Sequence, residues 1–361
     1  MKIAVVIDTW FPVVGGGQIN AWEISKRLAK KGVQIDIITR NCRKDNLTPV
    51  QNLKVYKLGK KTDAGNFLSK IIFIFKSFFF IAGKNYDLVH GHAFLPGITA
   101  RLIMVFKGIP ALITVHGFSF NTNLNNVFSR QIEKFILTRI LYSAQITVSQ
   151  DFLSVKNVNN KVFYISNGVD VKNFDKIKAT KFKNPTLIFV GRLHPQKNLK
   201  NLIRAIVLVK ESISDVKFLI VGEGFQKGEL MNLVQKLHLK NNVKFLGQKT
   251  SKDLIRVYKS SHAFILPSIY EGQPLSLLES WASKLTPIVS NTGDCRYLVK
   301  NGVNGYVLKN IDPKGIATGV LVAFKKKNLE KLGLAGYTVV KNELSWERSA
   351  EKTLRLYKSL T

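Results

Sequence analysis

The chain of 361 residues is long enough for two domains, and its 45% hydrophobic content is ordinary for a globular protein with a sizeable core. Its net charge of +32 favours anionic partners such as nucleic acid, anionic lipid or phosphorylated substrates, although a lysine-rich surface that reflects genome composition would explain the charge as well. The two distant cysteines, Cys42 and Cys295, exclude a cysteine metal or redox motif and favour a reducing compartment.

The sequence gives no support for a specific nucleic-acid-binding protein or for a secreted one. It contains no zinc-finger spacing, no aromatic-basic RNA-binding signature and no long basic tail, so no specific nucleic-acid partner is expected. Residues 1–8 form too short an apolar stretch for the core of a signal peptide. We therefore expect a cytoplasmic protein.

The first half alternates short apolar strands with helical patterns, which is typical of a doubly wound α/β domain. Helices are predicted at residues 19–31 and 67–81. Strands are predicted at residues 2–7, 34–39, 53–57, 86–92, 111–115, 145–148 and 162–165.

A glycine-rich turn at residues 12–17 separates the first strand from the first helix. Gly15, Gly16 and Gly17 would let a phosphate approach the backbone at the helix N-terminus. The dinucleotide fingerprint G-x-G-x-x-G is absent, and a tight turn alone would also need glycine. The turn is thus a candidate phosphate site only in combination with other motifs.

The helix at residues 67–81 is apolar almost all round and is punctuated by Lys70 and Lys76. It is shorter than the roughly twenty residues that span a bilayer. Two interpretations remain open: insertion into a membrane interface, or a buried helix packed on the sheet.

Histidines follow two predicted strands. His90 and His92 end the strand at 86–92, and His116 follows the strand at 111–115. Open α/β sheets bind ligands at the carboxyl ends of their strands, so these are candidate site residues, although a single histidine there is more often structural.

After a turn at 167–170 and a polar, lysine-rich linker at 172–184, a second α/β series begins. Arg192 and Lys197 lie between its first strand and the helix that starts near Leu199, where cations meet a bound phosphate; a solvated basic loop is the alternative. A final helix is predicted at 345–360. Strands are predicted at residues 186–191, 217–221, 243–246, 262–266, 287–290 and 305–307.

Residues 268–279 form a loop that leads into a helix beginning near Pro274. Glu271 lies just before the helix N-terminus, where free N–H groups favour anions. Glu279 falls on the apolar stripe of the helix and needs a partner, because an unpaired buried charge is costly. A phosphorylated, polyhydroxylated ligand would use both carboxylates. The alternative is a capping Glu271 and a Glu279 paired with a lysine.

Taken in order, these motifs resemble a known family. They are Gly15-Gly16-Gly17, His116-Gly117, Ser166-Asn167-Gly168-Val169-Asp170, Gly191-Arg192-Leu193 with Lys197, and Glu271-Gly272-Gln273-Pro274 through Glu279. The chain resembles the retaining glycosyltransferases of family four, which carry a Glu-x7-Glu motif. The resemblance implies the GT-B fold, an α/β architecture of two Rossmann-like doubly wound domains facing across a cleft. It places the acceptor-side domain at 1–175 and the nucleotide-sugar-binding domain at 185–340, with the helix at 345–361 packed back onto the first and a hinge near 172–184.

Roles for individual residues follow from the resemblance. Arg192 and Lys197 would hold the donor diphosphate, which the backbone at Gly16 and Gly17 would also meet. Glu271 and the amides of Gly272 and Gln273 would grip the donor sugar, and Glu279 would bind the ribose hydroxyls. His116 would lie beside the reacting sugar and the acceptor. Gln273, often apolar in relatives, and residues 293–297, which lack the usual double glycine and acidic residue, depart from the family pattern.

The implied activity is a retaining, metal-independent hexosyltransferase that moves a sugar from a UDP- or GDP-sugar to a glycan or lipid-linked acceptor in cell-surface polysaccharide or glycolipid synthesis. No D-x-D pair for a divalent metal is present, and no cofactor is expected besides the donor substrate. Peripheral attachment to the inner face of the cell membrane, at an anionic surface, is left open. The alternatives are a non-catalytic membrane- or nucleic-acid-binding protein, or a sugar-nucleotide epimerase of the same fold.

Overall fold

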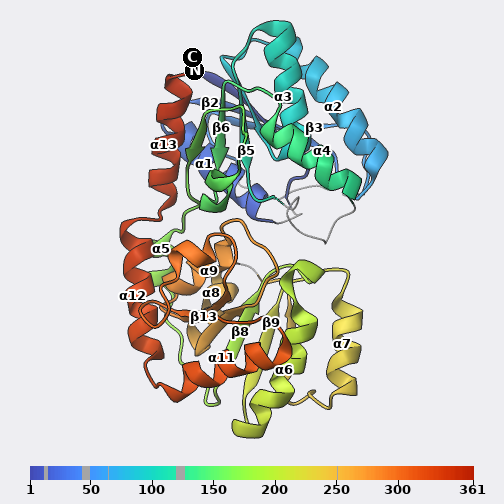
Figure 1. The fold of residues 1–361 in the computed structure, drawn as a ribbon. Helices are drawn as coiled ribbons and strands as arrows, with labels where there is room; N and C mark the ends of the chain where they lie inside the picture. The colour runs from blue at the N-terminus through green and yellow to red at the C-terminus, as the bar shows by residue number, and fades with distance from the viewer. Residues whose placement is uncertain (12–14, 43–48, 64, 119–126, 250) are drawn as a thin grey trace. The chain divides into compact units, whose positions relative to one another are not determined.

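The computed structural model describes residues 1–11, 15–42, 49–63, 65–118, 127–249 and 251–361. The first part of the predicted glycine-rich turn, residues 12–14, lies outside this description. The chain divides into two compact units (Figure 1). Unit 1 comprises residues 1–167 and 346–361, and unit 2 comprises residues 168–345.

Unit 1 is built, in its described residues, on one parallel sheet of seven strands in the order β3-β2-β1-β4-β5-β6-β7. The central strands are buried along almost their whole length, as expected where helices cover both faces of a parallel sheet. All strands predicted in this half are present. Their bounds are β1 (Lys2–Ile7), β2 (Gln34–Arg40), β3 (Leu53–Leu58), β4 (Leu88–His92), β5 (Ala111–Val115), β6 (Ala144–Thr147) and β7 (Val162–Tyr164).

The helices of unit 1 fall on two sides of this sheet. The strand order proceeds one way from β1 to β3 and the other way from β4 to β7, and right-handed crossovers then place α1 on one face and α2, α3 and α4 on the other. The bounds are α1 (Gly16–Lys30), α2 (Phe67–Ala82), α3 (Phe94–Lys107), α4 (Val127–Thr138), the short η1 (Gln150–Ser154) and α13 (Trp346–Lys358).

Helix α2 confirms the apolar helix predicted at 67–81, but only one side of it is buried. Phe73, Ser77 and Ile81 face the interior, whereas Phe67 and Phe75 are 73% and 58% exposed. The alternative of a buried helix packed on the sheet therefore holds for one side of α2 only, since the helix contacts β2 and β3 through that side. None of the helices in the described residues is long and apolar enough to cross a bilayer.

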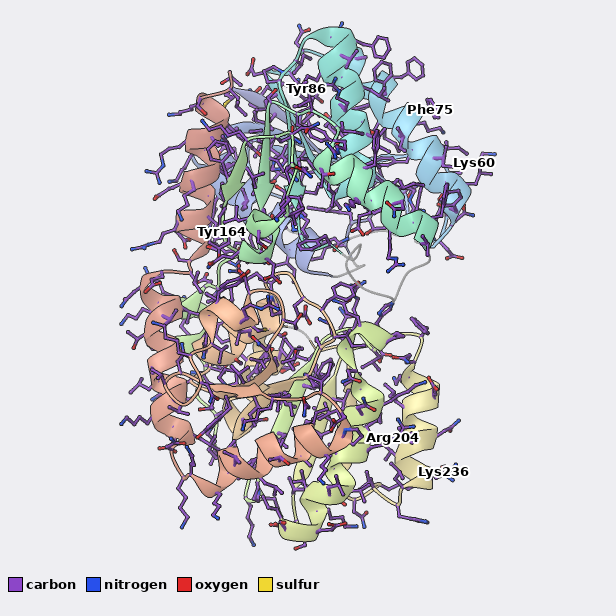
Figure 2. The ribbon with its side chains drawn as sticks, in the orientation of Figure 1. Lys60, Phe75, Tyr86, Tyr164, Arg204 and Lys236 are labelled. Atoms are coloured by element: carbon purple, nitrogen blue, oxygen red, sulfur yellow. The ribbon has the colours of Figure 1, made fainter. Side chains whose placement is uncertain are left out.

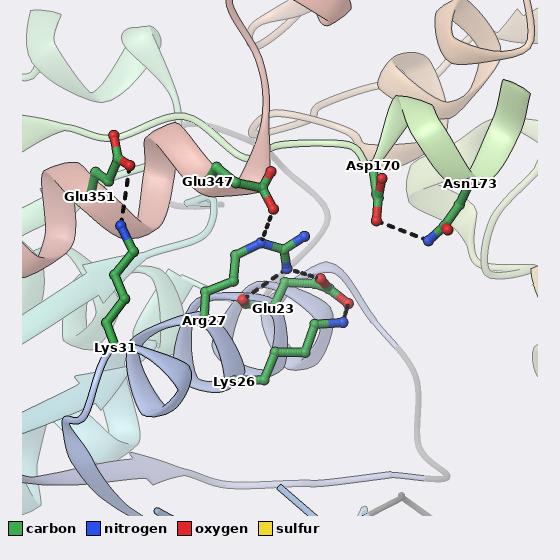
Figure 3. A network of polar contacts seen from close by, with 8 residues as sticks. All are labelled: Glu23, Lys26, Arg27, Lys31, Asp170, Asn173, Glu347 and Glu351. Carbon is green, nitrogen blue, oxygen red and sulfur yellow. Dashed lines mark hydrogen bonds and ion pairs between the residues drawn. The ribbon is translucent and has the colours of Figure 1, made fainter. Parts of the chain in front are cut away.

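The last helix, α13, packs beside α1 within unit 1. Figure 3 shows the polar contacts along this seam: Arg27 on α1 contacts Glu23 and donates to Glu347 at 2.8 Å, and Lys31 pairs with Glu351 at 3.1 Å. Beneath them, Trp346 and Tyr357 are buried. The final segment is thereby part of the core of unit 1 although it follows unit 2 in the sequence.

Unit 2 repeats the architecture with, in the described residues, six parallel strands in the order β10-β9-β8-β11-β12-β13. The strands are β8 (Thr186–Val190), β9 (Lys217–Val221), β10 (Val243–Gly247), β11 (Ala263–Leu266), β12 (Thr286–Ser290) and β13 (Tyr306–Leu308). The helices are α5 (Val171–Asp175), η2 (Pro195–Lys197), α6 (Leu199–Ser212), α7 (Lys227–Lys236), α8 (Ser251–Ser260), α9 (Leu275–Ala282), α10 (Cys295–Leu298), α11 (Pro313–Lys325) and α12 (Leu329–Asn342).

The border between the units differs from the one predicted. Residues 168–175, which we placed in the first domain, belong to unit 2, where the amide of Val169 donates to the carbonyl of Leu344 at 2.9 Å. The expected linker at 172–184 also lies in unit 2 and begins inside helix α5. A lysine-rich composition suggested a solvated connection, but the apolar Phe174 anchors this segment in the core.

Helices α9 and α12 meet at a point that has no room for a side chain. A Cβ atom at Gly336 would lie 1.9 Å from Cδ1 of the fully buried Trp281, whose indole N–H donates to the carbonyl of Asn304 at 2.9 Å. Gly336→Ala is therefore expected to destabilise unit 2 by about 3 kcal/mol through overpacking. The midpoint of urea unfolding, followed by circular dichroism, measures this.

A matched glycine serves as the control for this prediction. Gly228 lies in helix α7, and a Cβ atom there would meet nothing within 4 Å. Gly228→Ala is expected to raise stability by about 0.5–1 kcal/mol, because alanine favours a helix over glycine. Equal midpoints for the two variants would contradict the packing described.

Candidate active site

A lysine-carboxylate pair lies at the carboxyl edge of the unit 2 sheet. Lys197 ends the short helix η2 after β8, and Glu271 lies in the loop after β11. The Lys197 Nζ and Glu271 Oε1 atoms are 2.5 Å apart, and the side chains are only 12% and 6% exposed. The sequence interpretations of Glu271 as a helix cap and of Lys197 as a solvated loop residue are therefore wrong.

The loop that carries Lys197 is tied to the loop that carries Glu271. The Gln196 carbonyl accepts from the amide of Ile269 at 2.8 Å, and the Gln196 side chain donates to the carbonyl of Tyr270 at 2.9 Å. These bonds fix the two loops to each other and so keep Lys197 next to Glu271. The buried thiol of Cys295 lies close by: burial raises its pKa well above the ordinary value, and the negative Glu271 adds to that effect.

Arg192 supplies a second positive charge at this edge. The residue is exposed, and among the described residues its side chain makes no hydrogen bond or ion pair. The pKa of the His194 side chain is lowered by burial and then by the charges of Arg192 and Lys197. The edge thus concentrates positive charge, and the Arg192 guanidinium is open to a ligand.

The backbone at Gly272 and Gln273 is held by the loop after β12. The amide of Asp294 donates to the carbonyl of Gly272 at 2.8 Å, and the Gln273 side chain donates to Asp294 Oδ2 at 3.0 Å. Gly293 has a positive φ of 51°, and a Cβ atom there would lie 2.3 Å from the carbonyl oxygen of Glu271. Gln273 and residues 293–297, which both differ from the family pattern, are therefore in contact: the buried Gln273 side chain binds Asp294 in the loop at 293–297.

Glu279 lies one to two turns into helix α9. Its Oε2 atom accepts from the hydroxyl of Tyr258, on helix α8, at 3.0 Å. Burial raises the pKa of Glu279 to about 7, although the Tyr258 hydrogen bond lowers it in part. Among the described residues no lysine pairs with this carboxyl group, so the alternative of a lysine partner is wrong and the group stays close to half-ionised at neutral pH.

In unit 1 the predicted residues gather at the carboxyl edge of its own sheet. Gly16 and Gly17 begin helix α1, whose N-cap Gly15 provides no side-chain hydrogen bond. His116 directly follows β5, and a Cβ atom at Gly17 would lie 3.2 Å from its Cδ2 atom. Glycine at position 17 thus allows the His116 ring to lie against the start of the helix.

His116 is the outer member of a column of three imidazoles. His92 Nδ1 lies 2.9 Å from His116 Nε2, and the rings of His90 and His92 are tilted by 34° with centroids 4.4 Å apart. At the inner end, the two nitrogens of His90 each lie 2.6 Å from a hydroxyl, Nδ1 from that of Tyr357 on α13 and Nε2 from that of Thr114.

The column is uncharged near neutral pH. Burial lowers the pKa of His90 to about 3 and that of His116 to about 4, and it holds the pKa of His92 well below the ordinary value. Each ring therefore has one donor and one acceptor nitrogen. The bond to His92 occupies Nε2 of His116, which leaves Nδ1 as the nitrogen available to another group.

Several partners were not predicted from the sequence. Tyr258, Asp294 and Tyr357 each contact a predicted site residue from a distant part of the chain. The local sequence does not mark these residues as parts of a site, because Tyr258 and Tyr357 lie in ordinary amphipathic helices and Asp294 lies in a turn. Among the described residues, no group of three or more His, Cys, Asp or Glu could hold a metal ion.

The chain has two doubly wound parallel units, which is the architecture of the GT-B class of glycosyltransferase folds. The second unit carries cations and a paired carboxylate at its strand ends. A model described as Glycosyltransferase Family 4 matches residues 14–173, and one described as Glycosyl transferases group 1 matches residues 170–337. Together they cover residues 14–337. The chain belongs to the family-four glycosyltransferases.

Two curated relatives and one solved structure illustrate the likeness. An uncharacterised glycosyltransferase of Methanocaldococcus jannaschii is 27% identical, over 99% of this chain and 98% of its own. The UDP-Gal:alpha-D-GlcNAc-diphosphoundecaprenol alpha-1,3-galactosyltransferase of Escherichia coli is 30% identical, over 63% of each chain. The structure of sucrose-phosphate synthase from Thermosynechococcus elongatus has the same fold, with a TM-score of 0.87 at 21% identity over 99% of this chain and 98% of that one.

Proposed function

We propose that the protein transfers a sugar, with retention of configuration, from a UDP- or GDP-sugar to a glycan or lipid-linked acceptor in the synthesis of a cell-surface polysaccharide or glycolipid. The observation that carries the proposal is the buried Lys197–Glu271 pair with the open Arg192 beside it. A ligand that joins negative phosphates to a hydroxylated sugar matches both charges of this edge.

The donor would be held by groups of unit 2. Lys197 and Arg192 would contact the diphosphate, and the amides of Gly272 and Gln273, at the start of helix α9, would contact the sugar with Glu271. Glu279 would accept hydrogen bonds from the ribose hydroxyls. The support is the geometry of these groups: positive charge at the strand ends and a carboxyl group one to two turns inside the helix.

The chemistry would depend mainly on stabilising the leaving group. As the sugar–phosphate bond breaks, negative charge grows on the nucleoside diphosphate, and the fixed cations Lys197 and Arg192 would stabilise it. The acceptor hydroxyl would attack from the same face and pass its proton to the departing phosphate, so that no side chain has to act as a base. Under this proposal no divalent metal is required.

The groups of unit 1 would serve the acceptor and the reacting sugar. Neutral His116 would form a hydrogen bond through Nδ1, and Gly16 and Gly17 would offer backbone amides to phosphate. A lipid-linked acceptor is favoured because the E. coli relative is named for a diphosphoundecaprenol acceptor. That relative is also named for an α-1,3 linkage, and a donor with an α-linked sugar yields an α product only if the configuration is retained.

Calorimetry with a panel of nucleoside diphosphates and their sugars tests the donor site. Tight binding of one nucleotide to the wild type, and its loss in Glu279→Ala, is the expected result and would also identify the base. Failure of every nucleotide to bind to a folded protein would overturn the proposal. Product analysis then separates transfer, where the sugar is attached to an acceptor, from epimerisation, where it is free.

The pH dependence of nucleotide binding gives a sharper prediction for Glu279. Its pKa of about 7 means that the ionised fraction rises from about 0.1 at pH 6 to about 0.9 at pH 8. Because the ionised carboxylate is the better acceptor for ribose hydroxyls, affinity is expected to rise up to about tenfold over this range. The isosteric Glu279→Gln variant should lose this dependence while it keeps the titration of the ligand's own phosphate, and parallel profiles for the two proteins would contradict the role of Glu279.

A further inference from the structure

An unusually apolar surface covers the outside of three helices of unit 1. Among the described residues, 23 large apolar side chains are exposed, and twelve of them lie on α2, α3 and α4, with six, two and four respectively. They are Phe67, Leu68, Ile71, Ile72, Phe75, Phe79, Val105, Phe106, Val127, Phe128, Ile132 and Phe135. We call this set the α2–α4 face. A solvated helix would expose polar side chains instead.

The helices that carry the α2–α4 face are neighbours. Helices α2, α3 and α4 lie on the same side of the sheet, and α3 packs against both of the others. The ring of Phe78 bridges α2 and α3, with centroids 5.3 Å from Phe79 and 5.8 Å from Phe106. Figure 2 shows Phe75 on the outer side of α2. Apolar patches that extend over several elements mark interaction surfaces.

The charged side chains of the same helices are predominantly positive. Six Lys or Arg residues occur in α2, α3 and α4, against the single acid Glu133, which is buried. Lys76, Lys107 and Lys134 are exposed between the apolar side chains, and Lys60 lies beside the start of α2 (Figure 2). A partner must therefore accept apolar side chains and carry negative charge.

We propose that the α2–α4 face inserts into the interface of an anionic lipid bilayer. Phenylalanine, leucine and isoleucine side chains would enter the boundary of the acyl chains, while the long lysine side chains reach the anionic headgroups. Charge complementarity selects this partner: the face offers cations around an apolar centre, and an anionic bilayer offers negative headgroups above an apolar layer.

The direction of the strands links this face to the candidate active site. In a parallel sheet each helix begins at the carboxyl edge of the preceding strand, so the first residues of α2 and α4 lie at the edge that carries His92 and His116. Two of the residues near these starts are highly exposed: Phe67 is 73% and Phe128 is 75% exposed. A face inserted in this way would bring that edge close to the headgroups, which suits a lipid-linked acceptor and in this respect rests on the proposed function.

Vesicle sedimentation tests the proposal with the full chain. Neutral phosphatidylcholine vesicles are compared with vesicles that contain 30% phosphatidylglycerol, at low and high salt. The wild type is expected to bind the anionic vesicles and to retain part of this binding at high salt. Phe75→Glu combined with Phe79→Glu should weaken binding at least about tenfold, and Lys76→Gln or Lys107→Gln about fivefold each at low salt.

The matched control places the same two charges at two other exposed apolar residues. Val322→Glu combined with Leu334→Glu, on α11 and α12 of unit 2, should bind vesicles about as well as the wild type after correction for its charge. Circular dichroism verifies that both double variants are folded. Equal binding by the two double variants, or no binding of the wild type to anionic vesicles, would overturn the proposal.

Two further measurements, of dimer formation and of nucleotide binding, distinguish failure of the membrane proposal from failure of the proposed transfer activity. If the wild type forms a concentration-dependent dimer that Phe75→Glu with Phe79→Glu abolishes, and vesicles do not bind, the α2–α4 face contacts a second copy and the proposal is wrong. Nucleotide binding by the same variant should equal that of the wild type. Vesicle binding without any nucleotide binding would reject the proposed transfer activity and leave the membrane surface intact.

Discussion

Lys197→Met is expected to lower kcat for sugar transfer about 1,000-fold. The substitution removes the buried cation that would stabilise the leaving diphosphate, and a preorganised charge of this kind typically contributes two to three orders of magnitude. It also leaves Glu271, which is 6% exposed, without its partner. Release of the nucleoside diphosphate from the donor, measured with saturating donor and acceptor, gives kcat directly.

Three comparisons make this result specific to the charge. Lys197→Arg should retain more activity than Lys197→Met, because the positive charge remains. Lys240→Met changes an exposed lysine before β10, at the opposite edge of the same sheet, and should leave kcat unchanged. Activity of the wild type should persist in EDTA, since the protein's own cations would stabilise the diphosphate. Full activity of Lys197→Met would contradict the proposed donor site.

His116→Leu is expected to lower kcat about 100-fold while donor affinity stays within a few-fold of the wild type. The ring would contribute a single hydrogen bond through Nδ1, and loss of one such preorganised group costs about this much. Because the pKa of His116 is about 4, the wild type should show no loss of activity from protonation of this ring between pH 8 and pH 5.5. An acid limb near pH 6.5 that vanishes in His116→Leu would contradict the assignment.

His92 would act through His116 as a positioning residue. Its Nδ1 atom lies 2.9 Å from His116 Nε2 and fixes which nitrogen of that ring faces outward. His92→Leu should lower kcat about tenfold and release the tautomer of His116. Imidazole nitrogen NMR distinguishes this from a merely structural loss, because it reports whether His116 keeps a single tautomer.

Much of the fold was predictable because its signals are local. The strands of both sheets are short apolar runs bounded by turn residues, and their order with the intervening helices indicates two doubly wound domains. The apolar helix at residues 67–81 was recognisable for the same reason. Whether one side of this helix is exposed stayed open, because composition shows how many apolar residues a helix has and not how many of them another element covers.

The border between the units and the partners in the site depend on distant contacts. The lysine-rich composition of residues 172–184 indicated a linker, yet Phe174 packs into the core of unit 2 and Val169 binds the backbone at Leu344. Likewise, comparison of single positions with the family pattern does not reveal that Gln273 binds Asp294, because the two residues meet only in the folded chain.

The sequence by itself determined the two-domain α/β class and placed the candidate site residues at strand ends, since spacing along a chain reports the period of an element and the identity of its ends. Only the tertiary structure decided the state of these residues. Lys197 is paired with Glu271, Glu279 is held near half-ionisation by burial beside Tyr258, and His116 is neutral at the end of a buried column. The charge of each group depends on its solvation and its neighbours, and these arise where segments far apart in the chain are brought together.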